Sequence, residues 1–286
     1  MPATALKFGI TLPNYGDYCG FAGNLAELAF EAEKSDWDGF FLFDHIQYSQ
    51  TESIPMADPW VALAAIAAKT QRIRIGTLVT PIARRRPWKL ARETATIDHL
   101  SGGRLVLGVG LGDPVDAEFT PFGEDSEARA RAAKLDEGLE ILAGLWSGER
   151  FSYKGRYTTV QAVQFLPRPL QTPRIPIWVA GRWPTHKPFL RAARWDGAFP
   201  LGKVVGSKLN PDELQAVTGF IKAHRTDVSH FDLVATSGAE GLVADEETLA
   251  AYAAAGVTWW MQDLRKWRNS HDELLTRIRQ AHRPYQ

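Results

Sequence analysis

Short apolar runs alternate along this chain with longer segments in which apolar positions recur every three or four residues. The short runs predict β-strands, several of them without polar alternation, as expected where both faces of a sheet are covered. The predicted strands are residues 6–12, 39–43, 72–79, 105–109, 175–180, 197–200, 231–236 and 257–261. The periodic segments predict helices at residues 21–35, 59–69, 87–100, 127–146, 187–195, 212–224, 246–255 and 272–281.

Strict alternation of strand and helix implies parallel strands joined by crossover helices, and eight such units can close a (β/α)₈ (TIM) barrel. An open doubly wound sheet is the alternative, but it usually has fewer strands, and no Gly-x-Gly-x-x-Gly follows the first strand. Residues 1–286 are expected to form one domain, because barrels reach this length as single units.

The alternation pauses at residues 151–173, where Tyr153, Gly155 and Tyr157 predict a small inserted hairpin that three prolines follow. Long segments follow the second, fourth, sixth and eighth strands, whereas most segments that lead into strands are short. In barrels the functional face carries the loops that leave the strands. We therefore expect the site at the C-terminal ends of the strands.

Composition narrows the class of protein. The 45% hydrophobic and 23% charged residues are typical of a globular protein, and a formal net charge of zero provides no field for nucleic acid or an anionic membrane. No secretory signal or membrane-spanning run is recognised. Cys19, the only cysteine, excludes an internal disulfide and fits a reducing compartment. We expect a cytoplasmic protein without nucleic-acid or membrane partners.

Asp44 and His45 end the second strand and are the most informative pair. A His that leaves a barrel strand at its C-terminal end points toward the mouth, where an imidazole can exchange a proton near neutral pH. The alternative is that His45 only hydrogen-bonds a loop and that Asp44 caps a helix.

The fourth strand ends in alternating glycines, including Gly110 and Gly112, which would let a backbone or a flat ring approach closely. Asp113 follows them and is either an acid of the pocket or a turn residue before Pro114. As a phosphate loop the segment is weak, because no Lys-Ser/Thr follows it.

Two further strand ends offer polar groups. Thr77, Leu78 and Thr80 end the third strand and could contact the edge of a heterocycle. After the fifth strand, a glycine turn ahead of a helix with an arginine nearby suggests a phosphate seat. It consists of Ala180, Gly181 and Arg182.

Other candidates carry less chemistry. The remaining histidines show no metal-ligand spacing, so no metal site is predicted, and no Gly-x-Ser-x-Gly elbow is present. The arginines at residues 84–86 could meet an anionic tail, although three charges in a loop are more often solvated. Of Trp259 and Trp260, one ring should point into the barrel and the other toward the helices. The inward ring could line a substrate pocket, although filling the core is the commoner role.

Taken together, the Asp-His strand end, the Leu-Ser-Gly-Gly-Arg block at residues 100–104 and the glycine-rich strand that follows it resemble the bacterial luciferase-like superfamily of flavin- and deazaflavin-dependent oxidoreductases. The resemblance runs nearly from end to end. It implies a barrel with an inserted segment, a cofactor ring across the mouth and a non-proline cis peptide behind the ring, by position at Thr77–Leu78.

The resemblance also implies roles for residues. His45 matches the catalytic histidine, and Asp113 matches an acid that is glutamate in the sugar-phosphate dehydrogenases of the family. Asp44, Thr77, Leu78, Thr80, Gly110 and Gly112 would contact the cofactor ring, and Ala180, Gly181 and Arg182 its phosphate. A homodimer that acts on a small-molecule substrate is expected.

An Asp-His pair at this strand end is typical of family members that use the deazaflavin coenzyme F-420, whereas luciferases tend to have Glu-His or His-His there. We therefore predict hydride transfer between a deazaflavin and a small organic substrate. The first alternative is an FMN-dependent monooxygenase, and the second is a non-catalytic flavin-binding barrel.

Overall fold

A computed structural model describes residues 6–20, 23–226, 230–241, 244–268 and 270–280. Eight parallel strands close into a barrel in the order β1-β10-β9-β8-β7-β4-β3-β2, which confirms the predicted (β/α)₈ fold. The strands are β1 (Lys7–Leu12), β2 (Gly39–Leu42), β3 (Arg74–Pro81), β4 (Leu105–Gly110), β7 (Ile177–Arg182), β8 (Gly197–Leu201), β9 (Asp232–Thr236) and β10 (Trp259–Asp263).

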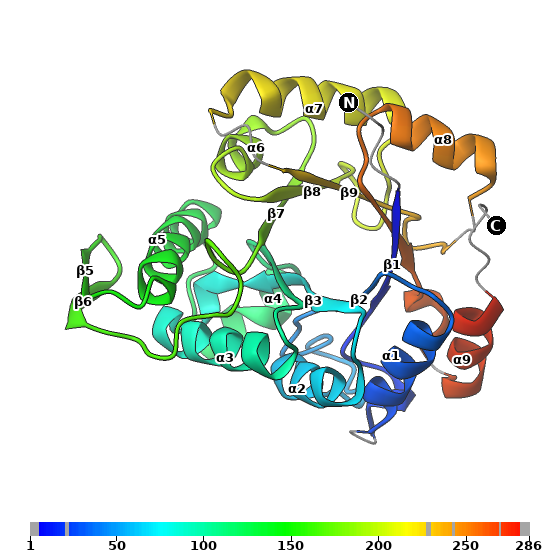
Figure 1. Cartoon of the computed structure of the whole chain (residues 1–286), viewed down its shortest axis with the longest axis horizontal. Helices are drawn as coiled ribbons and strands as arrows, with labels where there is room; N and C mark the ends of the chain where they lie inside the picture. The colour runs from blue at the N-terminus through cyan, green and yellow to red at the C-terminus, as the bar shows by residue number, and fades with distance from the viewer. Residues whose placement is uncertain (1–5, 21–22, 227–229, 242–243, 269, 281–286) are drawn as a thin grey trace.

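Helices surround this barrel, as Figure 1 shows. The longer ones are α1 (Asn24–Lys34), α2 (Pro59–Lys69), α3 (Pro87–Leu100), α5 (Ala128–Trp146), α6 (His186–Ala192), α7 (Pro211–His224), α8 (Glu246–Ala254) and α9 (His271–Gln280). The predicted hairpin is confirmed as β5 (Phe151–Lys154) and β6 (Thr159–Val163), which lie beside α5 at the left of Figure 1. No helix in the described ranges is both long and apolar enough to span a membrane.

Two apolar cores hold the barrel together. One fills its interior and includes Phe41, Trp178 and Trp259, whose rings contact one another. The other lies between the strands and the helices and includes Trp260. The two neighbouring tryptophans thus point to opposite sides of β10, as the two-residue period predicts, and Trp259 fills the core near the start of its strand.

Several strand boundaries differ from the predictions for physical reasons. β3 begins at Arg74 rather than Arg72, because the Glu33 carboxylate accepts the backbone N–H groups of residues 71–73. β10 extends past Met261, because Gln262 and Asp263 still pair with β1 despite their polarity. A polar side chain does not end a strand whose backbone remains paired.

The cis peptide that the resemblance implies is present but lies one residue further along, at Leu78–Val79 rather than Thr77–Leu78. The pairing of β3 with β4 shifts register between Thr77 and Thr80, so the irregular residues of the strand are Leu78 and Val79. Thr77 still belongs to the regular ladder and pairs with Leu107.

Candidate functional site

The backbone of His45, just beyond β2, is fixed by a side chain from the end of β1. Asn14 is fully buried; its Oδ1 accepts the His45 N–H (3.0 Å) and its Nδ2 donates to the His45 carbonyl (2.8 Å). Nδ2 also donates to the carbonyl of Ala57 (2.8 Å). Asn14 thus ties the loops after β1 and β2 together, and sequence reasoning missed it, although it is a polar residue at a strand end.

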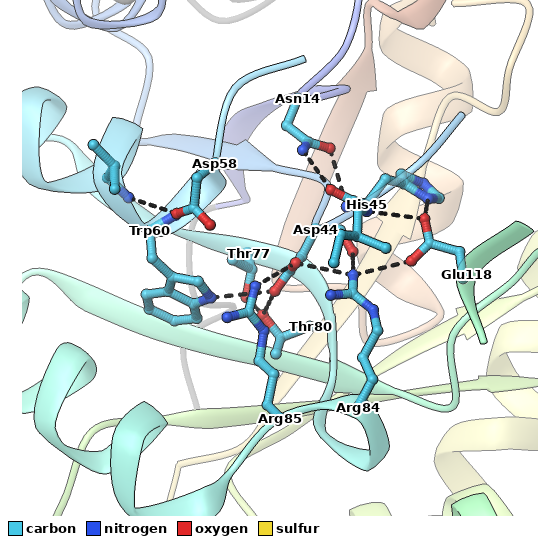
Figure 2. Close-up of polar contacts among 12 residues, drawn as sticks. Asn14, Asp44, His45, Asp58, Trp60, Thr77, Thr80, Arg84, Arg85 and Glu118 are labelled. Carbon is cyan, nitrogen blue, oxygen red and sulfur yellow. Dashed lines mark hydrogen bonds and ion pairs between the residues drawn. The ribbon is translucent and has the colours of Figure 1, made fainter. Parts of the chain in front are cut away.

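Asp44 is buried, and its carboxylate is bound by neighbouring side chains of the protein (Figure 2). Its Oδ1 lies 2.6 Å from Nη2 of Arg85 and 3.1 Å from Nη2 of Arg84. Its Oδ2 accepts hydrogen bonds from the Thr80 hydroxyl (2.8 Å) and the Trp60 indole (3.2 Å). Asp44 caps no helix; Asp58 caps α2 instead.

Electrostatics keep Asp44 charged in this position. Burial would raise the pKa of its carboxyl, but the guanidinium groups of Arg85 and Arg84 outweigh burial, and the pKa lies below its usual value. The expectation that arginines 84–86 are solvated is therefore wrong for two of them: the side chains of Arg84 and Arg85 are only 6% and 16% exposed. A buried carboxylate requires such partners.

Glu118 is a second buried carboxylate, and it contacts the His45 ring (Figure 2). Its side chain is 1% exposed, and Oε1 lies 2.9 Å from His45 Nδ1. Oε1 also accepts the backbone N–H of Ile46 (3.1 Å), and Oε2 lies 3.0 Å from Nη2 of Arg84. Arg84 therefore joins Glu118 to Asp44, and the polar cluster is continuous from His45 to Arg85.

The long segment after β4 contains a helical turn that places Glu118. This turn, α4 (Val115–Glu118), was predicted as loop, and it ends at Glu118 itself. Arg131 of α5 donates to the carbonyls of Leu111 (2.8 Å) and Gly112 (2.7 Å) and stacks on the fully buried Phe119. No local pattern marks Glu118 as a site residue, because its role depends on this fixed loop.

The rest of the His45 ring has aromatic neighbours. The ring centroids of Tyr15 and Phe43 lie 5.4 Å and 5.9 Å away in edge-on geometry. The His45 side chain is 21% exposed, and within the described residues Glu118 is the only polar partner of its ring. Nε2 thus has no partner of its own and is free to bind a proton donor or acceptor.

An apolar ledge lies at the mouth, formed by the half-buried Val79, Ala180 and Leu201, which pack on the interior core. Gly110 lies between the first two: a Cβ there would stand 2.7 Å from Val79 Cγ2 and 3.7 Å from Ala180 Cβ. A side chain at this position would therefore break the ledge. Leu78 is buried behind it.

Asp113 and Arg182 form a separate, more exposed pair, with Oδ2 and Nη2 3.3 Å apart and side chains 55% and 37% exposed. Arg182 also donates to the carbonyl of Gly202 (3.1 Å). A Cβ on Gly181 would lie 2.3 Å from Pro188, so close packing against α6 explains this glycine. Gly112 has a left-handed backbone (φ 84°), which likewise requires glycine.

The predicted residues thus fall into three groups. Asp44, His45, Thr77 and Thr80 share one cluster, in which the Thr80 hydroxyl lies 3.0 Å from that of Thr77. Gly110 and Ala180 meet at the ledge, and Asp113 meets Arg182. The acid that contacts His45 is Glu118. Within the described residues, no group of three or more His, Cys, Asp or Glu side chains could hold a metal ion.

Fold and site define a barrel whose charged groups gather at the mouth, around a histidine with one free ring nitrogen. The chain belongs to the luciferase-like monooxygenase family, whose model matches residues 8–285.

The chain is similar in sequence to characterised members of this family. The F420-dependent glucose-6-phosphate dehydrogenase of Microbacterium testaceum is 36% identical over 184 residues, which cover 63% of this chain and 52% of that protein. The chain spans about half the length of the first curated relatives it matches.

Two solved structures share the fold over nearly their whole lengths. The coenzyme F420-dependent tetrahydromethanopterin reductase of Methanopyrus kandleri superposes with a TM-score of 0.72 at 17% identity, over 96% of this chain and 97% of that one. A monooxygenase from Streptomyces bottropensis gives 0.70 at 24% identity, with the same coverage of both chains.

Proposed function

We propose that this chain is a deazaflavin-dependent oxidoreductase that moves a hydride to or from a small organic substrate, with His45 as the proton-exchanging group. The observation that carries the proposal is His45 at the C-terminal end of β2, with Nδ1 bound to Glu118 and Nε2 free. In the oxidative direction, Nε2 accepts the proton of a substrate hydroxyl while the hydride leaves the adjacent carbon. The deazaflavin relatives support the choice of cofactor.

The residues at the mouth fit a planar ring. The ledge of Val79, Ala180 and Leu201 offers an apolar surface, and Gly110 keeps it free of a protruding side chain. When bound there, the deazaflavin supplies a carbon that accepts or gives a hydride. Leu78 belongs to the interior core on which the ledge packs, and Thr77 and Thr80, on either side of the bulge, are proposed with Gly112 to complete the cofactor site.

Asp44 acts indirectly in this proposal, because its carboxylate is saturated by Arg84, Arg85 and two hydrogen-bond donors. Arg182, with Ala180 and Gly181, is proposed to bind the cofactor phosphate, because its guanidinium is partly exposed near the ledge. Asp113 is proposed to orient Arg182, with which it forms an ion pair, and to assist the substrate proton.

Cofactor titration followed by fluorescence quenching tests the proposal. We expect saturable quenching with coenzyme F-420 and weaker binding of FMN. Tight FMN binding without deazaflavin affinity would overturn the choice of deazaflavin and favour the FMN-dependent monooxygenase. The family name and the similar Streptomyces structure support that alternative. If neither cofactor binds, the proposal fails.

A His45→Gln variant tests the role of the imidazole. We expect it to bind the cofactor with unchanged affinity and to lose turnover by about 100-fold or more, the contribution typical of a positioned acid or base. Full turnover in this variant would remove His45 from catalysis. Cofactor binding without turnover in the wild type on alcohols, aldehydes or ketones would favour the non-catalytic barrel.

We also propose that the protein is one domain that works as a homodimer in the cytoplasm, without nucleic-acid or membrane partners. Cys19 is a buried free thiol, which suits a reducing compartment. The net charge of zero argues against a polyanionic partner. Sedimentation in solution would measure the oligomeric state.

A further inference from the structure

We propose that Glu118 is a positioning residue that holds the His45 imidazole with its proton on Nδ1, so that the lone pair of Nε2 faces the mouth. The consequence for catalysis rests on the proposed function, but the tautomer itself does not. Glu118 was not among the residues that sequence or resemblance indicated, and it lies 73 positions from His45.

The geometry leaves Glu118 little freedom. Its Oε1 is held by the Ile46 N–H (3.1 Å) as well as by His45 Nδ1 (2.9 Å), and its Oε2 by Arg84 (3.0 Å). The Ile46 N–H, the Gln47 N–H (3.5 Å from Oε1) and Arg84 can only donate, and an ionised carboxylate can only accept. Nδ1 must therefore carry the hydrogen, which leaves Nε2 as an acceptor whenever the ring is neutral.

Arg84 keeps this arrangement charged, because it binds Glu118 and Asp44 with the same Nη2 atom. The buried cluster of Asp44, Glu118, Arg84 and Arg85 is balanced, with two negative and two positive charges. When Nε2 accepts a substrate proton, the imidazolium lies directly against Glu118. The aromatic neighbours of the ring, Tyr15 and Phe43, offer it no opposite charge.

Nitrogen-15 NMR of histidine-labelled protein tests the tautomer without cofactor or substrate. In the neutral ring of His45 we expect a protonated Nδ1 and an unprotonated Nε2, with the signals assigned by their loss in His45→Gln. His230 provides a contrast in the same spectrum, because its Nε2, not its Nδ1, lies 2.9 Å from Asp232 Oδ1. A wild-type His45 protonated on Nε2 would overturn the proposal.

Two variants remove different parts of the interaction. Glu118→Ala removes the acceptor, so the ring should change to the Nε2–H form that free imidazole side chains prefer in water. Glu118→Gln keeps the shape of the side chain but not its charge, and it serves if the alanine variant does not fold. Retention of the Nδ1–H form in Glu118→Ala would show that something else orients the ring.

Activity of the cofactor-loaded enzyme separates positioning from a merely structural role. For Glu118→Gln we expect kcat to fall about 10- to 100-fold with little change in KM or cofactor affinity. The loss is smaller than that of a general base itself, because His45 remains in place. Glu118→Asp should recover part of kcat, and the matched control His230→Gln should leave it unchanged.

An unchanged kcat in Glu118→Gln would contradict the positioning role. If the protein shows the Nδ1–H tautomer but binds neither cofactor, the proposed function fails and the proposal about the tautomer stands. The two proposals can therefore fail separately.

Discussion

Buried arginines lie at both ends of this barrel, and they differ in what they bind. At the N-terminal end, Arg104 of the Leu-Ser-Gly-Gly-Arg block donates to four backbone carbonyls and one hydroxyl. At the C-terminal end, Arg84 and Arg85 bind the carboxylates of Asp44 and Glu118. Carbonyls carry no net charge, whereas a buried carboxylate can hold a histidine that exchanges protons.

The difference separates stability from chemistry. The partners of Arg104 lie at residues 67–73 and 101, so its side chain ties the end of α2 and the approach to β3 to the turn before β4. The Leu-Ser-Gly-Gly-Arg block, one of the features that carry the family resemblance, is therefore a structural connection at the end of the barrel opposite the site. In barrels, such residues at the N-terminal face serve stability, and residues at the C-terminal face serve function.

Asp44→Asn should have the largest effect on stability. It leaves Arg84 and Arg85 with one buried carboxylate between them, and breaking a buried ion pair in this way costs about 3–5 kcal/mol of the free energy of unfolding. Urea denaturation at pH 7 measures the loss. A loss below about 1 kcal/mol in the free energy of unfolding would mean that the buried cluster of Asp44, Glu118, Arg84 and Arg85 does not depend on its charge balance.

The same variant changes the response to acid. The folded-state pKa of Asp44 is lowered, so its carboxylate contributes stability above the unfolded value of about 3.9, and this is lost as the pH falls through the folded value. We expect the free energy of unfolding to fall less steeply below about pH 4 in Asp44→Asn than in the wild type. Parallel curves would contradict this.

Arg104→Met should cost about 3 kcal/mol, because it leaves several buried carbonyls without donors while filling most of the space. Cofactor affinity and the pH–rate profile of the folded fraction should be unchanged. Arg74→Met is the control, since Arg74 binds the nearby Gly103 carbonyl and Gln171 from a part-buried position. An altered pH–rate profile in Arg104→Met would contradict the conclusion that the N-terminal end of the barrel serves stability alone.

Asp113→Asn should have the smallest effect on stability, within about 0.5 kcal/mol, because its ion pair with Arg182 is exposed. We expect a several-fold weaker affinity for the cofactor or a lower turnover, and a smaller loss of kcat than in Glu118→Gln. A larger loss of kcat than in Glu118→Gln would mean that Asp113 contributes more to turnover than the contact between Glu118 and His45.

The sequence by itself determined the barrel, because each strand and helix follows from a local period of apolar residues and eight alternating units have few ways to close. It also placed His45, Asp44, Gly110 and Arg182 at the correct end of the strands, since strand direction alone decides that. The family resemblance added the cis peptide, within one residue of its position.

Only the tertiary structure decided which of these groups meet. Glu118 reaches His45 from another loop, and Arg84 and Arg85 turn inward instead of into solvent, because Asp44 and Glu118 are buried and need positive partners. Asn14 completes the site from the loop after β1. Contacts between loops depend on how the barrel closes, and residue spacing along the chain does not carry that information.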